Sequence, residues 1–195
     1  MTRLFDIIFS FFGLLLLSPL FLIIALWIIM DDPGPVFYRQ QRVGKDGKDF
    51  GLLKFRSMRV GADKMSLITI GERDPRVTRA GYYIRKYKLD ELPQLWNVFI
   101  GDMSLVGPRP EVRRYVELYT SEQRKVLSIR PGITDYASIE YIDENRLLAL
   151  SSDPDKTYIE EIMPAKIALN MRYINHQTIG EYIKIIFLTF YKIIR

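Results

Sequence analysis

Two adjacent carboxylates, Asp90 and Glu91, stand among basic residues in the most informative stretch of this chain. Six Lys and Arg side chains precede them between positions 73 and 88, and Arg109 follows between two prolines. Carboxylates bind divalent cations, whereas guanidinium groups bind phosphate oxygens through paired hydrogen bonds. A carboxylate can also attack phosphorus and carry the phosphoryl group covalently. These residue types together indicate phosphoryl transfer.

Two expected helices would position the dyad. Residues 82–88 are predicted to form a helix that aims Arg85 toward the acidic pair. Because Pro93 is tolerated only in the first turn of a helix, the next helix should begin near Asp90 or Glu91 and run to about Val98. Acidic residues at a helix N-terminus also have an ordinary explanation, because they stabilise the macrodipole and cap free amides. On the dyad alone, capping is the better interpretation.

Other catalytic patterns are weak. Asp153-Pro154-Asp155 matches the Asp-x-Asp motif of metal-dependent glycosyltransferases, but the preceding serines and the proline are typical of a turn. The chain contains no phosphate-binding loop, dinucleotide fingerprint or nucleophile elbow. The single histidine, His176, is expected to be a solvated turn residue.

A hairpin should bring two further cations to the site. Residues 36–42 and 50–58 flank a turn at 43–48, which predicts two paired strands. In the second strand Lys54 and Arg56 alternate with Phe55 and therefore share the face opposite the phenyl ring. That face is either solvated or an anion site.

Composition limits the function classes. A chain of 195 residues can form one domain with a substantial core, and 48% hydrophobic residues exclude disorder. The absence of cysteine excludes disulfides, Cys-ligated zinc and thiol catalysis. The net charge of +5 indicates an anionic partner. Since no nucleic-acid motif is visible, we expect phosphorylated substrates and membrane phospholipids rather than nucleic acid.

The N-terminal segment is a membrane element. Residues 7–30 carry no charge and are long enough as a helix to cross about 30 Å of hydrocarbon. Near the middle, Pro19 removes a backbone donor and clashes with the carbonyl of Leu15, so a kink is expected there. The hydroxyl of Ser18 could satisfy that carbonyl. The segment is either a kinked transmembrane span, which the residues alone favour, or a re-entrant helix that returns to the same face.

Flanking charges suggest the orientation. Four basic residues follow the apolar segment within residues 31–48, against Arg3 alone before it, which predicts a cytoplasmic body. Arg3 and Asp6 would share a helix face at the water boundary, either as an exposed ion pair or near lipid headgroups. Residues 179–195 are basic and aromatic-rich, which suits a helix at a bilayer surface or a core helix with a solvated edge.

Between these elements, helices are predicted at 111–119 and 123–128, and a turn at 131–134.

Residues 1–134 resemble the monotopic phosphoglycosyl transferases, bacterial sugar transferases that begin the assembly of lipid-linked glycans. The matching motifs, in the family's order, are Arg3-Leu4-Phe5-Asp6, Ser18-Pro19, Lys54-Phe55-Arg56-Ser57-Met58, Arg85 with Leu89-Asp90-Glu91-Leu92-Pro93-Gln94-Leu95, Gly101-Asp102-Met103-Ser104, Val106-Gly107-Pro108-Arg109-Pro110 and Arg130-Pro131-Gly132-Ile133-Thr134. The resemblance implies ping-pong transfer of a sugar-1-phosphate from a UDP-sugar to undecaprenyl phosphate with release of UMP. It also implies a cytoplasmic-face location on the bacterial inner membrane, with downstream glycosyltransferases as further partners.

The resemblance also assigns roles to residues. It implies that Asp90 attacks the sugar-bearing phosphorus and forms the metal site with Mg²⁺, and that Glu91 completes the catalytic dyad. Arg85 matches a phosphate-contacting position, and Pro108-Arg109-Pro110 matches the nucleotide-binding segment. We expect Lys54, Arg56 and Thr134 to belong to the same phosphate and nucleotide site.

The resemblance reverses the topology favoured by the residues alone, because the Ser18-Pro19 break implies a re-entrant helix. The expected fold is α+β: a mostly helical, membrane-associated single domain with a small β-hairpin and amphipathic interfacial helices. Residues 1–30 would form the re-entrant helix-break-helix. Residues 31–195 would form the cytoplasmic catalytic domain, ending in an amphipathic helix at 179–195.

One departure from the family pattern concerns the sugar. After Gly-Ile-Thr many members continue Gly-Trp-Ala-Gln-Val-Asn-Gly-Arg-Asn, whereas this chain continues from Asp135 to Asp143 without that arginine, for which Ile142 or a neighbour stands. The identity of the sugar is therefore not predicted. A different function class also stays open, namely a catalytically silent membrane-anchored scaffold that binds acidic lipids or a glycan-pathway partner.

Overall fold

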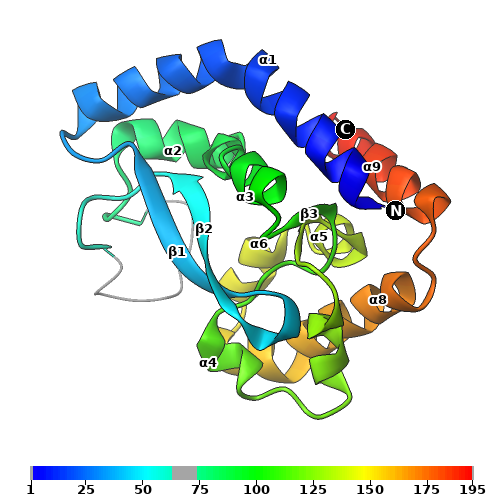
Figure 1. Ribbon diagram of the computed structural model, residues 1–195. Coiled ribbons are helices and arrows are strands. Elements are labelled where there is room, and N and C mark those ends of the chain that lie inside the picture. The colour runs from blue at the N-terminus through cyan, green and yellow to red at the C-terminus, as the bar shows by residue number, and fades with distance from the viewer. Residues whose placement is uncertain (1, 63–73, 195) are drawn as a thin grey trace.

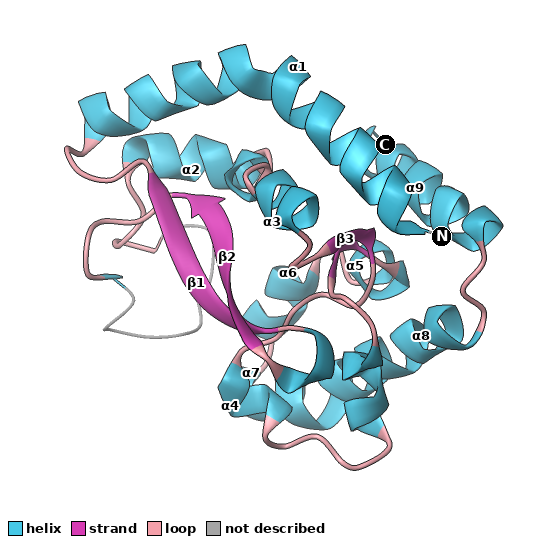
Figure 2. Cartoon of the chain, viewed as in Figure 1, coloured by secondary structure: helices cyan, strands magenta, loops and turns pink. Residues whose placement is uncertain are grey.

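The computed structural model describes residues 2–62 and 74–194, which combine helices with two small sheets (Figures 1 and 2). Its α-helices are α1 (Thr2–Asp31), α2 (Arg79–Lys86), α3 (Gln94–Ile100), α4 (Arg113–Val116), α5 (Tyr136–Glu140), α6 (Glu144–Ala149), α7 (Pro154–Thr157), α8 (Met163–Asn175) and α9 (Ile179–Ile194). Among the described residues, 3-10 turns include Lys45–Gly47, Leu89–Glu91 and Gln123–Ser128, and a π-helical turn lies at Tyr158–Ile162. The mixed, mostly helical character predicted from the sequence is confirmed. Arg73, one of the basic residues near the dyad, lies outside the described residues.

The predicted hairpin is confirmed. Strand β1 (Phe37–Val43) pairs antiparallel with β2 (Asp49–Phe55), from Phe37 opposite Phe55 to Val43 opposite Asp49. In the connecting turn Asp46 and Gly47 have φ angles of 57° and 73°, in the left-handed region that aspartate and glycine tolerate. The second strand ends at Phe55, three residues earlier than predicted, and the buried ring of Phe55 stacks on Phe37.

A second sheet corrects the prediction for residues 131–134. Strand β3 (Ser104–Val106) pairs in parallel with β4 (Gly132–Thr134), where the sequence predicted a turn. The two backbone segments approach so closely that a Cβ atom added to Gly132 would lie 2.1 Å from the amide nitrogen of Gly107. Glycine is therefore required by this close approach rather than by a turn.

The next two predicted helices are also altered. The helix expected at 111–119 is reduced to the single turn of α4, and residues 123–128 form a 3-10 helix. The helix expected at 179–195 is confirmed as α9. His176 follows α8 as an exposed turn residue, as predicted.

The N-terminal helix α1 is continuous but bends near its middle (Figure 1). Pro19 lies in this region, and the Ser18 hydroxyl donates a hydrogen bond of 2.8 Å to the carbonyl oxygen of Leu15. This is the contact expected where proline removes the helical N–H partner. The predicted bend and its local compensation are therefore both present.

Both arms of α1 contact the same body. In the first arm the Arg3 guanidinium donates to the carbonyl oxygens of Val98 and Phe99, the latter at 2.8 Å, at the end of α3. In the second arm Ile24 and Ile28 are buried in a cluster with Phe55, Ala80 and Ile84, which belong to β2 and α2. The helix is thus attached to the body on both sides of its bend.

Asp6 is buried, which corrects the expectation of an exposed pair with Arg3. Its side chain is 1% exposed, and one carboxylate oxygen accepts hydrogen bonds from the Ser104 hydroxyl at 2.9 Å, the Leu105 amide at 2.9 Å and the Tyr182 hydroxyl at 2.8 Å. These donors belong to β3 and α9. Burial of a carboxylate is tolerated when it accepts several hydrogen bonds.

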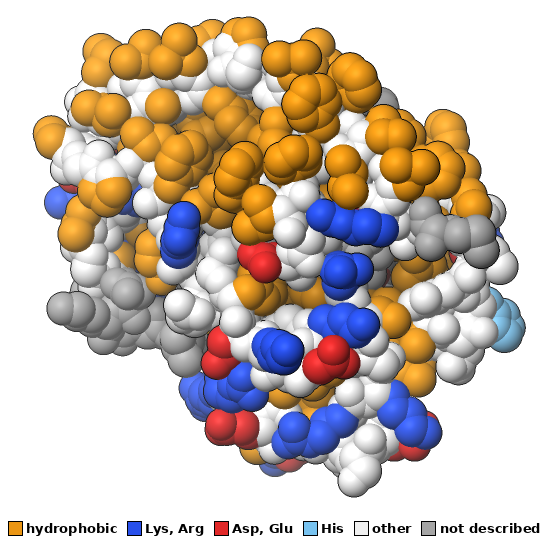
Figure 3. Space-filling model, viewed as in Figure 1, with side chains coloured by type: hydrophobic (Ala, Val, Ile, Leu, Met, Phe, Trp, Pro, Cys, Tyr) orange, Lys and Arg blue, Asp and Glu red, His pale blue; other side chains and the backbone are white. Residues whose placement is uncertain are grey.

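The rest of α1 presents apolar side chains outward. Most of its large hydrophobic residues are exposed, and the helix is long and apolar enough to cross a membrane by length and composition. Figure 3 shows hydrophobic side chains gathered over α1 in the upper half of the molecule, with Lys, Arg, Asp and Glu gathered below. Helix α9 buries Tyr182 and Ile185 and exposes Phe187, Phe190 and Tyr191. One face of the body is therefore markedly apolar.

We predict that Asp6→Ala lowers the thermal midpoint of the detergent-solubilised protein more than Tyr182→Phe does. The first change leaves three buried donors without their acceptor, each costing about 1–3 kcal/mol, whereas the second removes one donor and leaves Asp6 with two. Scanning fluorimetry measures both midpoints. Equal midpoints for the two variants would contradict the central role of Asp6.

Candidate active site

The dyad lies in a 3-10 turn, not at the start of the predicted α-helix. Leu89–Glu91 forms this turn, Pro93 occupies the N-cap position, and α3 begins at Gln94. Lys88, just before the turn, has a φ angle of 57°, so the chain reverses sharply after α2. The two acidic side chains therefore project from a tight connection between α2 and α3.

A large cleft opens beside this turn. Its volume is about 610 Å³, within the usual range of roughly 300–1,000 Å³ for small-molecule sites. The sequence-predicted residues that line it are Lys54, Arg56, Arg85, Asp90, Glu91, Arg109 and Pro110. The structure therefore brings together residues from β2, α2, the 3-10 turn and the loop after β3.

Glu91 is held by two cations. Arg109 contacts it with both terminal nitrogens of its guanidinium, Nη1 lying 3.2 Å from Oε2 and Nη2 contacting Oε1. The Nζ atom of Lys54 lies 3.4 Å from Oε1. Burial acts to raise the pKa of Glu91, but the charges of Arg109 and Lys54 and the Arg109 hydrogen bond outweigh it and hold that pKa well below its ordinary value. Glu91 is therefore ionised, and its carboxylate is engaged by Arg109 and Lys54.

Asp90, in contrast to Glu91, is not held by a basic side chain among the described residues. Its side chain is 9% exposed and lines the cleft, and it has no ion pair or side-chain hydrogen bond among the described residues. Burial, and next the charge of Glu91, raise its pKa, while Lys54 and Arg85 oppose the shift. Two adjacent carboxylates thus have different environments, and Asp90 is the one available to attack phosphorus or bind a cation.

The two cations of the hairpin have different partners. Phe55 is buried while Lys54 and Arg56 both line the cleft, as the strand alternation predicted. Lys54 pairs with Glu91, whereas Arg56 pairs with Asp32 at the end of α1, Nη1 lying 3.3 Å from Oδ2. Arg56 therefore joins the cleft wall to the membrane helix.

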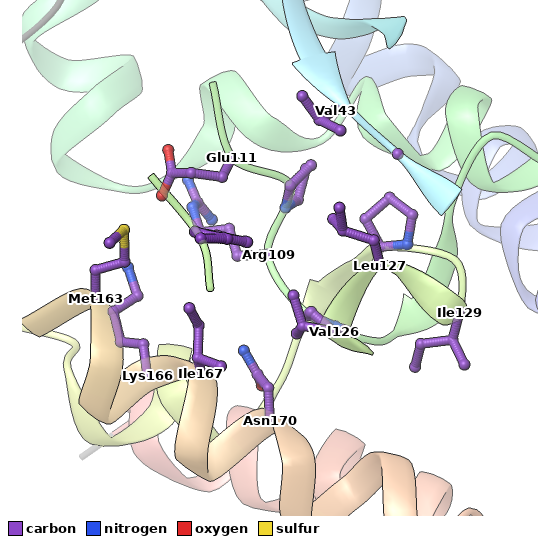
Figure 4. A pocket seen from close by; sticks show the side chains of 15 residues that line it. Val43, Arg109, Glu111, Val126, Leu127, Ile129, Met163, Lys166, Ile167 and Asn170 are labelled. Carbon is purple, nitrogen blue, oxygen red and sulfur yellow. The ribbon is translucent and has the colours of Figure 1, made fainter. Parts of the chain in front are cut away.

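Two predicted residues lie outside the cleft. Thr134 is buried in β4, and its hydroxyl is hydrogen-bonded at 2.6 Å to that of Thr189 in α9. Pro108 lines another cavity, of about 30 Å³. Figure 4 shows Arg109 and, from α8, Ile167 and Asn170 around this cavity. That volume suits one or two water molecules rather than a nucleotide.

Sequence reasoning missed the far wall of the cleft. It contains Arg42, which donates to Glu111 at 3.2 Å, and Tyr158, whose hydroxyl also donates to Glu111. Burial and then Glu111 raise the pKa of Tyr158 far above its ordinary value, so the phenol stays protonated. The π-helical turn that carries Tyr158 has no local sequence signal, although such turns are frequent at functional sites.

Asp153 and Asp155, the Asp-x-Asp motif, are both bound to other parts of the protein. Asp153 caps α7 by accepting a hydrogen bond of 3.1 Å from the Lys156 amide. Asp155 accepts one of 2.6 Å from the Tyr115 hydroxyl and pairs with Arg114. Neither residue lines the cleft. The motif is therefore the start of a helix rather than the predicted turn, and its geometry does not support a metal site.

A metal ion in the cleft would need ligands from the substrate. Among the described residues there is no group of three or more His, Cys, Asp or Glu side chains that could hold a metal by itself. Mg²⁺ is commonly bound by one or two carboxylates together with substrate phosphates and water. Asp90, unpaired and facing the cleft, fits that kind of shared site.

Comparison with known proteins adds the family. The family model described as "Bacterial sugar transferase" matches residues 1–195. The chain is 37% identical over 194 residues to a UDP-glucose:undecaprenyl-phosphate glucose-1-phosphate transferase of Escherichia coli, which covers 96% of this chain and 39% of that protein. It is 38% identical over 189 residues to a UDP-N-acetylgalactosamine-undecaprenyl-phosphate N-acetylgalactosaminephosphotransferase of Aeromonas hydrophila, covering 94% of this chain and 41% of that protein.

A third relative is closer in length. The exopolysaccharide production protein ExoY of Rhizobium meliloti is 42% identical over 147 residues, which cover 68% of this chain and 65% of that protein. The chain thus spans about two fifths of the first two relatives and about two thirds of the third.

We predict that Glu91→Gln lowers the pKa of Asp90. The negative charge of Glu91 disfavours a second charge on Asp90, and its removal also leaves Lys54 and Arg109 free to stabilise the ionised Asp90. Carbon-13 NMR titration of Asp-labelled, metal-free protein measures the change, with Asp90→Asn identifying the signal. Glu117→Gln, which alters an exposed carboxylate outside the cleft, serves as the control. An unchanged or raised Asp90 pKa in the Glu91 variant would contradict this account.

Proposed function

The chain belongs to the bacterial sugar transferase family, and we propose that it transfers a sugar-1-phosphate from a UDP-sugar to undecaprenyl phosphate with release of UMP. This would be the first membrane step in the assembly of a glycoconjugate such as an exopolysaccharide, capsule, O-antigen or glycoprotein glycan. The names of the related transferases support both substrates. The observation that carries the proposal is Asp90, a buried carboxylate without a side-chain partner in a cation-lined cleft.

The proposed reaction has two displacements at one phosphorus. An Asp90 oxygen attacks the sugar-bearing phosphorus, the bond from that phosphorus to the bridging oxygen breaks, and UMP leaves with that oxygen. Asp90 then holds the phospho-sugar as an acyl-phosphate. A phosphate oxygen of undecaprenyl phosphate attacks the same phosphorus, the bond to Asp90 breaks, and the carboxylate is restored. The first step needs Asp90 ionised and unpaired, and the second step returns it to that state.

The surrounding residues have separate proposed tasks. Arg85 is placed to bind the diphosphate, since it lines the cleft and acts electrostatically on Asp90. Arg109 has guanidinium N–H groups beyond those that contact Glu91, and these would bind the nucleotide phosphate beside Pro110. Lys54 and Glu91 act by holding one another and Arg109 in place. The position of Thr134 against α9 does not support a nucleotide contact.

Mg²⁺ is the proposed cofactor, held by Asp90 together with the diphosphate. When bound, it neutralises charge on the phosphate oxygens. Asp90 would hold the cation through its carboxylate, while Glu91 is kept from it by its two basic partners.

We predict that Asp90→Asn abolishes UMP release from UDP-sugars in the presence of undecaprenyl phosphate and Mg²⁺. An amide cannot serve as the nucleophile, so the expected loss is about a thousand-fold or more. Asp153→Asn, which changes a helix cap outside the cleft, should leave the rate unchanged. Full activity of the Asp90 variant would refute the nucleophile, and release of UDP in place of UMP would indicate a glycosyltransferase. Lipid binding without any turnover would indicate the scaffold function.

We also propose a monotopic topology, with α1 re-entering the cytoplasmic face of the bacterial inner membrane. In a full span, Arg3 and Asp6 would lie across about 30 Å of hydrocarbon from the body. Instead, Arg3 caps the carbonyl end of α3 and Asp6 is buried against β3 and α9, while Ile28 packs on α2. Contacts of both arms with one body, and the outward apolar side chains between them, support the re-entrant arrangement.

We predict that a cysteine at Thr2 is labelled only from the cytoplasmic side of sealed vesicles. The chain has no native cysteine, so a single introduced thiol reports its own position. A cysteine at Lys45, exposed in the hairpin turn of the body, marks the cytoplasmic side as a control. Labelling of position 2 from the opposite side alone would establish a transmembrane span.

A further inference from the structure

A buried carboxylate directly after β4 contacts the main chain of the cleft arginine. Asp135 is 1% exposed, and its Oδ2 atom accepts a hydrogen bond of 2.9 Å from the Arg109 amide. Its other oxygen accepts the Ser138 amide and so caps α5. Asp135 belongs to the segment in which the chain departs from the family pattern. We propose that Asp135 is a positioning residue that fixes the main chain of Arg109, and through it the guanidinium that holds Glu91.

The local sequence makes this contact unusually important. Because proline has no N–H group, Arg109 provides the only backbone donor in Pro108-Arg109-Pro110. That donor goes to Asp135. The flanking carbonyls are also bound: Pro108 accepts from the Gly132 amide at 3.0 Å, and Pro110 accepts from the Arg42 guanidinium at 3.2 Å. The segment is thus fixed at one donor and two acceptors.

The side chain of Arg109 depends on this fixed backbone. It is 37% exposed, so packing alone does not determine its direction, yet both terminal nitrogens meet the Glu91 carboxylate. A two-nitrogen contact tolerates little displacement of the Arg109 Cα atom, because both hydrogen bonds must stay aligned. The negative charge of Asp135 also lies near enough to favour the charged guanidinium. Asp135 therefore acts on the dyad through Arg109 and does not itself line the cleft.

The expected effect on kcat/KM rests on the proposed function. The hydrogen bond by which Asp135 fixes the Arg109 backbone can be tested without an activity assay. Hydrogen exchange is suited to the task, because a peptide covering Pro108-Arg109-Pro110 reports a single backbone amide in that segment. We expect this amide to be protected in the native protein and to exchange at least about tenfold faster in Asp135→Ala, which removes both acceptor oxygens. Rapid exchange in the native protein would overturn the proposal whatever the protein catalyses.

The functional test is a double-mutant cycle with UMP release as the readout. Asp135→Asn in the native background should lower kcat/KM by about tenfold, because the side-chain amide can accept one of the two backbone donors but not both. In an Arg109→Ala background the same change should have no further effect, since the group it positions is gone. Multiplicative losses in the two backgrounds would show a general structural role and refute positioning.

A matched control separates capping from positioning. Asp153→Asn alters the same kind of carboxylate cap at α7, outside the cleft. Because the asparagine oxygen can still accept the Lys156 amide, this change should alter neither kcat/KM nor the exchange of the Arg109 amide. Failure of the native protein to release UMP from any UDP-sugar would refute the proposed function. The exchange result would then still decide whether Asp135 fixes the Arg109 backbone.

Discussion

The ion cluster of Glu91, Arg109 and Lys54 is the constraint on which the cleft depends. It joins the 3-10 turn between α2 and α3 to strand β2 and to the loop after β3. A partly buried charge that loses its partner is costly, so the three segments cannot move apart independently. The same cluster decides the roles within the dyad. Because Glu91 pairs with both Arg109 and Lys54, Asp90 has no basic partner among the described residues. The two acidic residues look equivalent in the sequence, but in the structure Glu91 holds the cleft together and Asp90 is free to meet a ligand.

The apolar face and the cleft are separated by a single layer of structure. Helices α2 and α3 both contact α1, and the dyad lies in the turn that connects them. Tyr83 of α2 stacks on Trp27 of α1, and Phe99 of α3 contacts Phe11 of the other arm. Asp90 is therefore close to the apolar surface of the molecule. A transfer between a soluble nucleotide and a lipid phosphate requires such proximity, because neither substrate can leave its own phase.

The sequence predicted correctly those elements that depend only on neighbouring residues, such as turns and a proline bend. The turn residues between β1 and β2 predicted the hairpin, and Pro19 predicted both the bend and the Ser18 contact with Leu15.

Features that depend on contacts between distant parts of the sequence were missed. Asp6 follows Arg3 at helical spacing and so suggested a surface pair, yet its partners Ser104 and Tyr182 lie 98 and 176 residues away. The parallel pairing of β3 with β4 depends on the close approach of two glycine segments, which no single stretch of sequence reveals. Most of the predicted cleft residues do lie together, although they come from separate elements between Lys54 and Pro110. Thr134 belongs to β4 and is held away from the cleft by that pairing.

The segment from Ser104 to Arg109 links the membrane helix to the dyad. Its alternate backbone amides are taken by three different parts of the chain: Leu105 donates to Asp6 of α1, Gly107 donates to the Thr134 carbonyl of β4, and Arg109 donates to Asp135. An extended segment with its amides fixed at regular intervals has few ways to shift lengthwise. The position of the first arm of α1 and the position of the Arg109 guanidinium are therefore set along the same short piece of backbone. Attachment of the N-terminal arm to the body thus also determines where the cleft arginine meets Glu91, so that the position of α1 and the geometry of the dyad are parts of one structural constraint.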